Sequence, residues 1–219
     1  MTRTERRAPA GAFERHMLEA IALNEARAPL YSSLSDGASL AISRRLMVTE
    51  RALLPVARWF DRRARRWERA GIPVLEEVFM PMETAPSFVA RGREIRDPGN
   101  PPLDRSVRQR VLGRYREGGF EGAALALREA VDALMAEPGM DCLVRHLLES
   151  ACRLALLAPG QLRAAREREL PSPRRLLALL LRLHLWGLGR ARDLDEAARP
   201  LQARGIPILA QDLPPIPLP

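Results

Sequence analysis

The residues best suited to chemistry in this chain are two His-x-x-Glu pairs. His16 and Glu19 form the first pair, and His146 and Glu149 form the second. Residues three apart share one face of a helix, so each pair presents an imidazole beside a carboxylate. Such groups can bind a transition metal or act as an acid and a base. If the two pairs converge, they predict a metal-binding or oxidoreductase centre in a helical bundle.

A structural explanation competes with this metal site. Arg145, His146 and Glu149 share one helix stripe with Cys142 and Arg153, and leucines occupy the opposite stripe. A solvated helix face with an Arg–Glu pair four residues apart explains the pattern without a ligand. Ferritin-like di-iron bundles place Glu three residues before His, and this chain has no Glu-x-x-His motif. We therefore do not assign that family, and we favour the structural explanation.

An arginine cluster is the second candidate site. From residue 61 to residue 69 the chain reads DRRARRWER. Arginines at this density can bind phosphates, with Trp67 as a stacking partner. The simpler explanation is that Phe60, Ala64 and Trp67 face the core while the arginines are solvated. Under the less favoured hypothesis, the nucleic-acid-binding residues are Arg62, Arg63, Arg65, Arg66 and Arg69.

A long helix at about 42–70 must position the arginine cluster. Apolar residues from Leu46 to Trp67 recur four and then three apart, which predicts one buried face. Pro55 predicts a kink, and Gly71 predicts the end of the helix.

Prolines and glycines divide the rest of the chain. The other predicted helices cover about 12–27, 104–117, 120–137, 142–157, 174–186 and 194–204, and their ends fall next to Pro29, the pair Gly118–Gly119, Pro138, Pro159, Gly187 and the GIP motif at 205–207. The apolar segment 72–82 is bracketed by prolines and predicts an extended edge strand. Residues 83–102 read as a linker, and the proline-rich tail from 211 can extend along a surface or a partner.

The chain also matches itself. Residues 15–19 read RHMLE and residues 145–149 read RHLLE, a shift of 130. Residues 71–75 read GIPVL and residues 205–209 read GIPIL, a shift of 134. Other matched residues are Pro29 with Pro159, Arg44–Arg45–Leu46 with Arg174–Arg175–Leu176, and Asp61 with Asp195. These matches predict an internal repeat over 12–82 and 142–216.

The repeat predicts the fold. Each copy is a helix, a loop, a long helix and an extended segment, and neither copy would bury its apolar stripe alone. We predict a single all-α domain over 1–219, a helical bundle of two related units about a pseudo-twofold axis. The GIP segments would pair side by side, and the helices at 104–137 would bridge or cover the two units.

Glu50 and His184 are two further residues whose roles must be considered. Glu50 lies on the apolar stripe and is a possible further metal ligand, although its counterpart is Leu180. The leucine-rich helix at 174–186 is predicted to be a core helix rather than a membrane-surface helix, which makes His184 a core or boundary residue.

The composition and charge of the chain bear on its binding partners and its cellular location. Aromatic residues make up 5% of the 219 positions, and all 35 basic residues are arginine. The formal charge of +8 is a weak indication of nucleic-acid binding, because a chain without lysine points to biased codon usage. Cys142 and Cys152 would lie about 15 Å apart on one helix, too far apart for a disulfide. With no secretory or membrane-spanning segment, we predict a cytoplasmic protein.

These patterns assign no substrate or catalytic residue. The preferred function is a non-catalytic scaffold or protein-interaction module that self-associates through apolar surface near the GIP segments. The alternative is the metal-binding or oxidoreductase bundle described above, with a transition metal as cofactor. Arginine-mediated nucleic-acid binding is the second alternative.

Overall fold

The described part of the chain folds into five helices. A computed structural model describes residues 9–33, 37–80, 103–136, 142–206, 208–209, 213, 216 and 218–219. The helices are α1 (Ala12–Ser33), α2 (Gly37–Arg69), α3 (Leu103–Ala136), α4 (Cys142–Glu167) and α5 (Arg174–Ala203). The predicted all-α class is confirmed, with no strand in the described residues. The predicted linker at 83–102 lies outside them.

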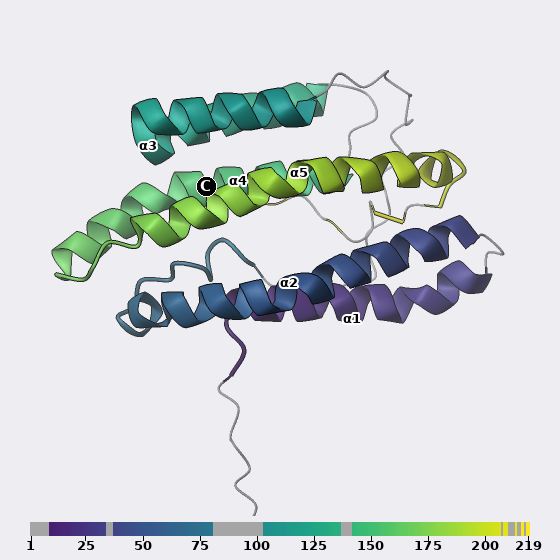
Figure 1. Ribbon diagram of the computed structural model, residues 1–219, viewed down its shortest axis with the longest axis horizontal. Helices are drawn as coiled ribbons and strands as arrows, with labels where there is room; N and C mark the ends of the chain where they lie inside the picture. The colour runs from purple at the N-terminus through teal and green to yellow at the C-terminus, as the bar shows by residue number, and fades with distance from the viewer. Residues whose placement is uncertain are drawn as a thin grey trace, which may run out of the picture.

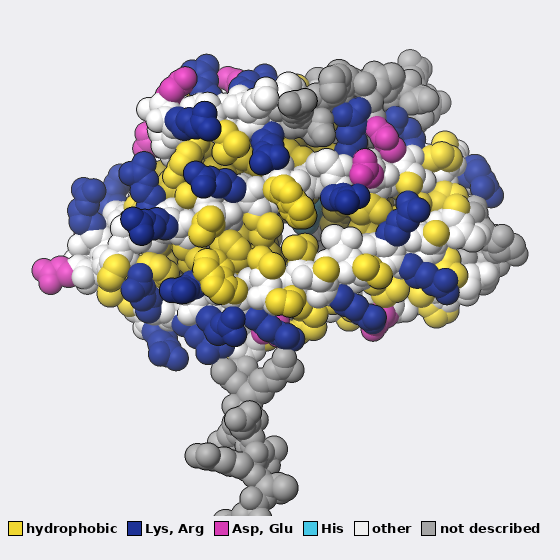
Figure 2. Space-filling model, viewed as in Figure 1, with side chains coloured by type: hydrophobic (Ala, Val, Ile, Leu, Met, Phe, Trp, Pro, Cys, Tyr) yellow, Lys and Arg dark blue, Asp and Glu magenta, His cyan; other side chains and the backbone are white. Residues whose placement is uncertain are grey.

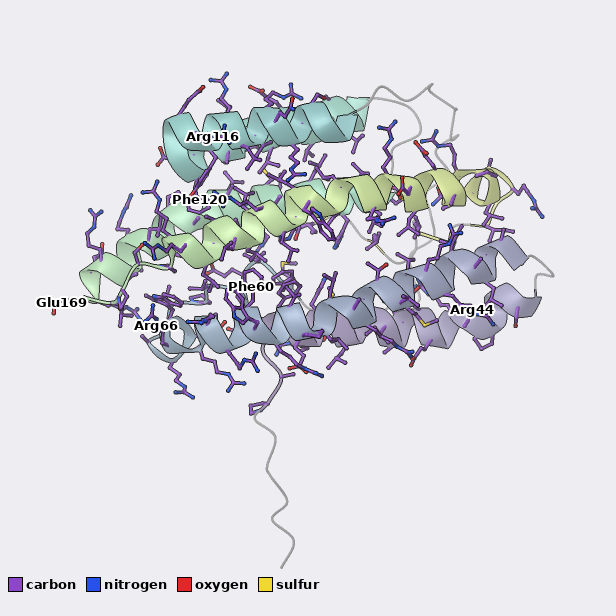
Figure 3. The ribbon with its side chains drawn as sticks, in the orientation of Figure 1. Arg44, Phe60, Arg66, Arg116, Phe120 and Glu169 are labelled. Atoms are coloured by element: carbon purple, nitrogen blue, oxygen red, sulfur yellow. The ribbon has the colours of Figure 1, made fainter. Side chains whose placement is uncertain are left out.

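The helices form three layers (Figure 1). The antiparallel pair α1 and α2 is one outer layer, the pair α4 and α5 is the middle layer, and α3 is the other outer layer. One large hydrophobic core runs through all three layers. Phe60 of α2 and Phe120 of α3 both point toward the middle layer (Figure 3), and each is 4% exposed.

The leucine-rich helix α5 forms the centre of the molecule. Leu177, Leu180, Leu181, Leu185 and Leu188 are all at most 2% exposed, so the predicted core helix is confirmed. None of the helices in the described part of the chain is both long and apolar enough to cross a bilayer.

Three predicted helix ends are wrong. α1 continues past Pro29, α4 continues past Pro159, and α5 runs through Gly187 and Gly189 to Ala203. A proline or glycine weakens a helix locally, but the helix can continue when the residues before and after it are held by tertiary packing. In α4, for example, buried residues lie both before Pro159 and after it.

The predicted break at Gly118–Gly119 is present inside α3. Gly119 has φ 63° and ψ −146°, outside the helical region. Gly122 then packs so closely on the carbonyl oxygen of Arg114 that a β-carbon there would come within 2.4 Å of it. The two predicted bridging helices are therefore two arms of α3 that lie side by side (Figure 1).

Turns follow α2 and α5 in the described residues. Gly71 (φ 77°) and Gly205 (φ 82°) end α2 and α5 in the left-handed conformation. The chain then makes further turns over 74–78 and 208–209, so no paired ribbon forms in the described residues. Val74 and Leu75 after the first glycine, and Ile208 and Leu209 after the second, are fully buried. These four side chains are therefore part of the core.

Candidate functional site

Two buried aspartates position the helices that carry the His-x-x-Glu pairs. Asp61 on α2 accepts hydrogen bonds from the backbone N–H groups of Phe13 (3.0 Å) and Glu14 (2.8 Å) at the start of α1. Asp195 on α5 accepts from Leu143 and Val144, each at 2.9 Å, at the start of α4. Each carboxylate accepts from two N–H groups that have no partner within their own helix, and it complements the positive end of the helix dipole.

The structure brings the two paired histidines together. The rings of His16 and His146 lie nearly parallel, at 9°, with their centroids 6.1 Å apart. His16 Nδ1 is 3.2 Å from the carbonyl oxygen of Met80, so this nitrogen carries the hydrogen and donates it. Burial lowers the pKa of His16, and the Met80 hydrogen bond and the Glu19 charge raise it. His16 is therefore held as a neutral imidazole.

The polar stripe of α4 is buried, which corrects the solvated-face explanation. Arg145 is 6% exposed, His146 9% and Glu149 5%. Residues of the C-terminal segment supply the partners: Arg145 donates to the carbonyl oxygen of Leu213 at 2.5 Å, and Ile216 N–H donates to Glu149 at 3.0 Å. Burial raises the pKa of Glu149, while the Ile216 hydrogen bond and Arg145 lower it.

The chain's third histidine joins the same cluster, as the sequence did not predict. The ring centroid of Phe79 lies 5.4 Å from that of His16 and 5.9 Å from that of His184. His184 Nδ1 donates to the carbonyl oxygen of Leu180 at 2.8 Å, so its Nε2 accepts from the Ser150 hydroxyl at 3.2 Å. All three histidines of the sequence therefore gather between the α1/α2 layer and the α4/α5 layer.

Ser150 and His184 share a hydrogen bond of the kind that joins a catalytic serine to its general base, but they have no other property of such a pair. Burial lowers the pKa of His184 to about 4, which makes it a weak proton acceptor at neutral pH. Ser150 is 4% exposed and His184 5%, so neither group is open to a substrate. The pair serves as a hydrogen-bonded link between α4 and α5.

The predicted metal ligands do not form a complete ligand set. Within the part of the chain that the structure describes, no group of three or more His, Cys, Asp or Glu residues is arranged to hold a metal ion. His16 and His146 meet, whereas Glu149 bonds to Ile216 and Arg145. Glu50 lies elsewhere, hydrogen-bonded to Asn24. What the cluster offers to a metal is two imidazoles.

The arginine cluster lies at the end of α2. Arg62, Arg63, Arg66 and Arg69 are exposed, whereas Arg65 is half-buried. Trp67 is 4% exposed, and its Nε1 donates to the carbonyl oxygen of Pro171 at 2.6 Å. The tryptophan is therefore a core residue, as the simpler explanation held, and it cannot stack on a base. Figure 2 shows that arginines far outnumber acidic side chains on the face that it presents.

In its described residues the protein is all-helical, with a histidine cluster between two of its layers and arginines on its surface. Comparison with protein-family models, curated protein sequences and solved structures gives no match.

Proposed function

We propose that this protein is a non-catalytic helical interaction protein, built from two related halves, that self-associates through the outer face of α1 and α2. The halves are the hairpin α1/α2 with its glycine turn and the hairpin α4/α5 with its own. The burial of Ser150 and His184 in the histidine cluster favours an interaction role over catalysis.

Matched hydrogen bonds support the relationship of the halves. The shift of 130 relates Phe13 and Glu14 to Leu143 and Val144, and the shift of 134 relates Asp61 to Asp195; both aspartates make the same pair of caps. The glycine turns also match, because Ile72 N–H bonds to Trp67 O at 2.9 Å and Ile206 N–H bonds to Leu201 O at 3.0 Å. Equivalent contacts this far apart in sequence are expected from a duplication.

A difference between the two halves supports the choice of this surface. α3 covers α4 and α5, with Cys152 Sγ against Ala124 O at 3.9 Å, and Leu148, Cys152 and Ala155 are at most 2% exposed. The matching residues of α1 lie on an uncovered face: Leu18, Ala22 and Glu25 are all exposed. Leu18 is 43% exposed and Val48 on the adjacent α2 is 67% exposed.

The charges on this face are self-complementary. An ion pair between Glu25 of α1 and Arg51 of α2 lies between the levels of Leu18 and Val48 along the hairpin. A twofold axis through such a face would place each acid near the base of the other copy, with apolar contacts on either side. The second copy would thus cover the face that α3 covers in the other half.

Replacing Val48 with glutamate is expected to convert a dimer into a monomer, because it places a charge in the centre of an apolar contact. We expect the dimer to weaken about thirtyfold or more, measured by sedimentation equilibrium over a range of concentrations. Leu125→Glu is the matched control, because Leu125 is 56% exposed on α3, away from this face. A wild-type chain that stays monomeric at all concentrations would contradict the proposal.

Metal binding is the second candidate function, favoured by the approach of His16 to His146. If it is correct, the purified protein should contain a transition metal, and His16→Ala and His146→Ala should each abolish it in elemental analysis. A metal-free protein, with unchanged behaviour of both variants, would reject the metal site. Arginine-mediated nucleic-acid binding is the third candidate, and it is supported by the exposed arginines at the end of α2, which are Arg62, Arg63, Arg66 and Arg69.

A further inference from the structure

Although α5 is the central core helix, one of its sides is exposed. The helix contacts α4, α2 and α3, and its core leucines are buried. On its remaining side, exposed residues recur every three or four positions, which places them in one line along the helix. We call this line the α5 stripe, and its members are Arg175, Leu179, Arg182, Trp186 and Arg190.

Exposed apolar surface is the first property of the α5 stripe. Trp186 is 59% exposed and Leu179 is 44% exposed. The two residues are seven positions apart, so they lie on the same side of the helix with about 10 Å between them. The other tryptophans, Trp59 and Trp67, are less exposed than Trp186. Exposed apolar side chains that lie close together commonly mark a binding surface.

Positive charge is the second property of the α5 stripe. Between residues 174 and 192 the sequence has five arginines and neither Asp nor Glu. Asp193 follows this segment and pairs with Arg190 at 3.8 Å. α5 lies in front of α4 in Figure 1, and Figure 2 shows arginines interspersed with hydrophobic side chains on the same face. A partner that fits the stripe is therefore negatively charged and takes up apolar side chains.

We infer that the α5 stripe binds the surface of an anionic lipid bilayer. The arginines would bind lipid phosphates, while Trp186 and Leu179 would enter the boundary between headgroups and acyl chains. A bilayer requires no groove in the protein, which suits a stripe on the convex side of a helix. A nucleic-acid strand could use the arginines and the ring of Trp186, but it would leave Leu179 without an apolar contact. This binding is independent of self-association, which uses the outer face of α1 and α2.

Sedimentation of the full chain with lipid vesicles tests the inference. The protein should sediment with vesicles of phosphatidylglycerol and phosphatidylcholine in equal parts, and not with vesicles of phosphatidylcholine alone, because the arginines require anionic headgroups. On the anionic vesicles the tryptophan fluorescence should shift to shorter wavelength as Trp186 leaves water. Trp186→Phe should remove this shift and retain binding, because phenylalanine keeps an apolar ring at the same position.

Variants distinguish the α5 stripe from a general effect of charge. Trp186→Ala should weaken binding to the anionic vesicles at least about tenfold, because it removes the apolar ring. Arg182→Gln should weaken it about fivefold, the effect expected of one basic residue near an anionic bilayer. Arg163→Gln is the matched control, because Arg163 is exposed on α4, which lies behind α5 in Figure 1. Salt screens charges that are far from the bilayer, so this variant should bind within about twofold of wild type.

Three results would overturn the inference. The first is a wild-type chain that does not sediment with the anionic vesicles. The second is an equal loss of binding in Arg182→Gln and Arg163→Gln, which would mean that only the total charge matters. The third is binding of a single-stranded oligonucleotide, with quenching of the Trp186 fluorescence, by a chain that does not bind the vesicles; the stripe would then be a nucleic-acid site.

Discussion

Asp195→Ala is expected to lower the free energy of unfolding by about 2–4 kcal/mol. The change removes the acceptor for two backbone N–H groups at the start of α4, and Val144 beside them is buried. Loss of a helix N-cap costs about 1–2 kcal/mol, and a buried donor left without a partner adds about 1–3 kcal/mol. Urea unfolding followed by circular dichroism would measure the difference.

The same experiment on Asp61 tests the relationship of the halves. Asp61 makes the equivalent two bonds to the start of α1, so Asp61→Ala should cost a similar amount. Asp193→Ala is a control on the same helix as Asp195, because its side chain is 68% exposed and pairs with Arg190 only at 3.8 Å; it should change stability by less than about 0.5 kcal/mol. A loss at Asp195 alone would mean that the two caps are not equivalent.

The aspartate caps show what could be predicted from the sequence and what could not. Their matched positions were evident from the repeat, but their role was not. Each cap joins residues 47 to 52 positions apart, and local patterns predict capping only between near neighbours. The helices themselves were predictable because apolar spacing within one helix is a local property. Their ends at Pro29 and Pro159 were wrong because tertiary packing overrides a local weakness.

The histidine cluster, too, was predicted from the sequence only in part. The repeat drew attention to His16 and His146, and the structure places them together. His184 was predicted to be a core or boundary residue, and it is buried. Its place beside the pair, and that of Phe79, were missed, because nothing local links these residues to the pair. The burial of Arg145 and Glu149 was also missed, since it depends on Leu213 and Ile216, 67 or more positions away. A polar helix stripe is predicted to be solvated unless a distant segment covers it.

Acidification is expected to remove the contribution that the histidine cluster makes to the stability of the fold. Burial lowers the pKa of His184 from 6.5 to about 4, so this residue is neutral in the folded chain and gains a proton more readily in the unfolded chain. Its contribution to stability is therefore present above pH 6.5 and is lost as the pH falls toward 4. A change of this size corresponds to about 3 kcal/mol, and burial lowers the pKa of His16 in the same direction.

Carboxyl groups whose pKa is raised by burial act in the opposite sense and must be separated from the histidines; Asp61 and Glu149 share this direction with Glu50 and Glu68. Burial raises the pKa of Glu50 and that of Glu68 from 4.5 to about 7, so their contribution falls as the pH rises through that range. Together these two shifts are larger than that of His184, so replacing both residues with glutamine should shift the pH dependence toward a loss of stability between neutral pH and pH 4. In that background, His184→Leu should flatten the loss, because a leucine cannot bind the proton. If urea unfolding shows the same pH dependence with leucine at position 184 as with histidine, His184 is not the group that makes the fold sensitive to acid.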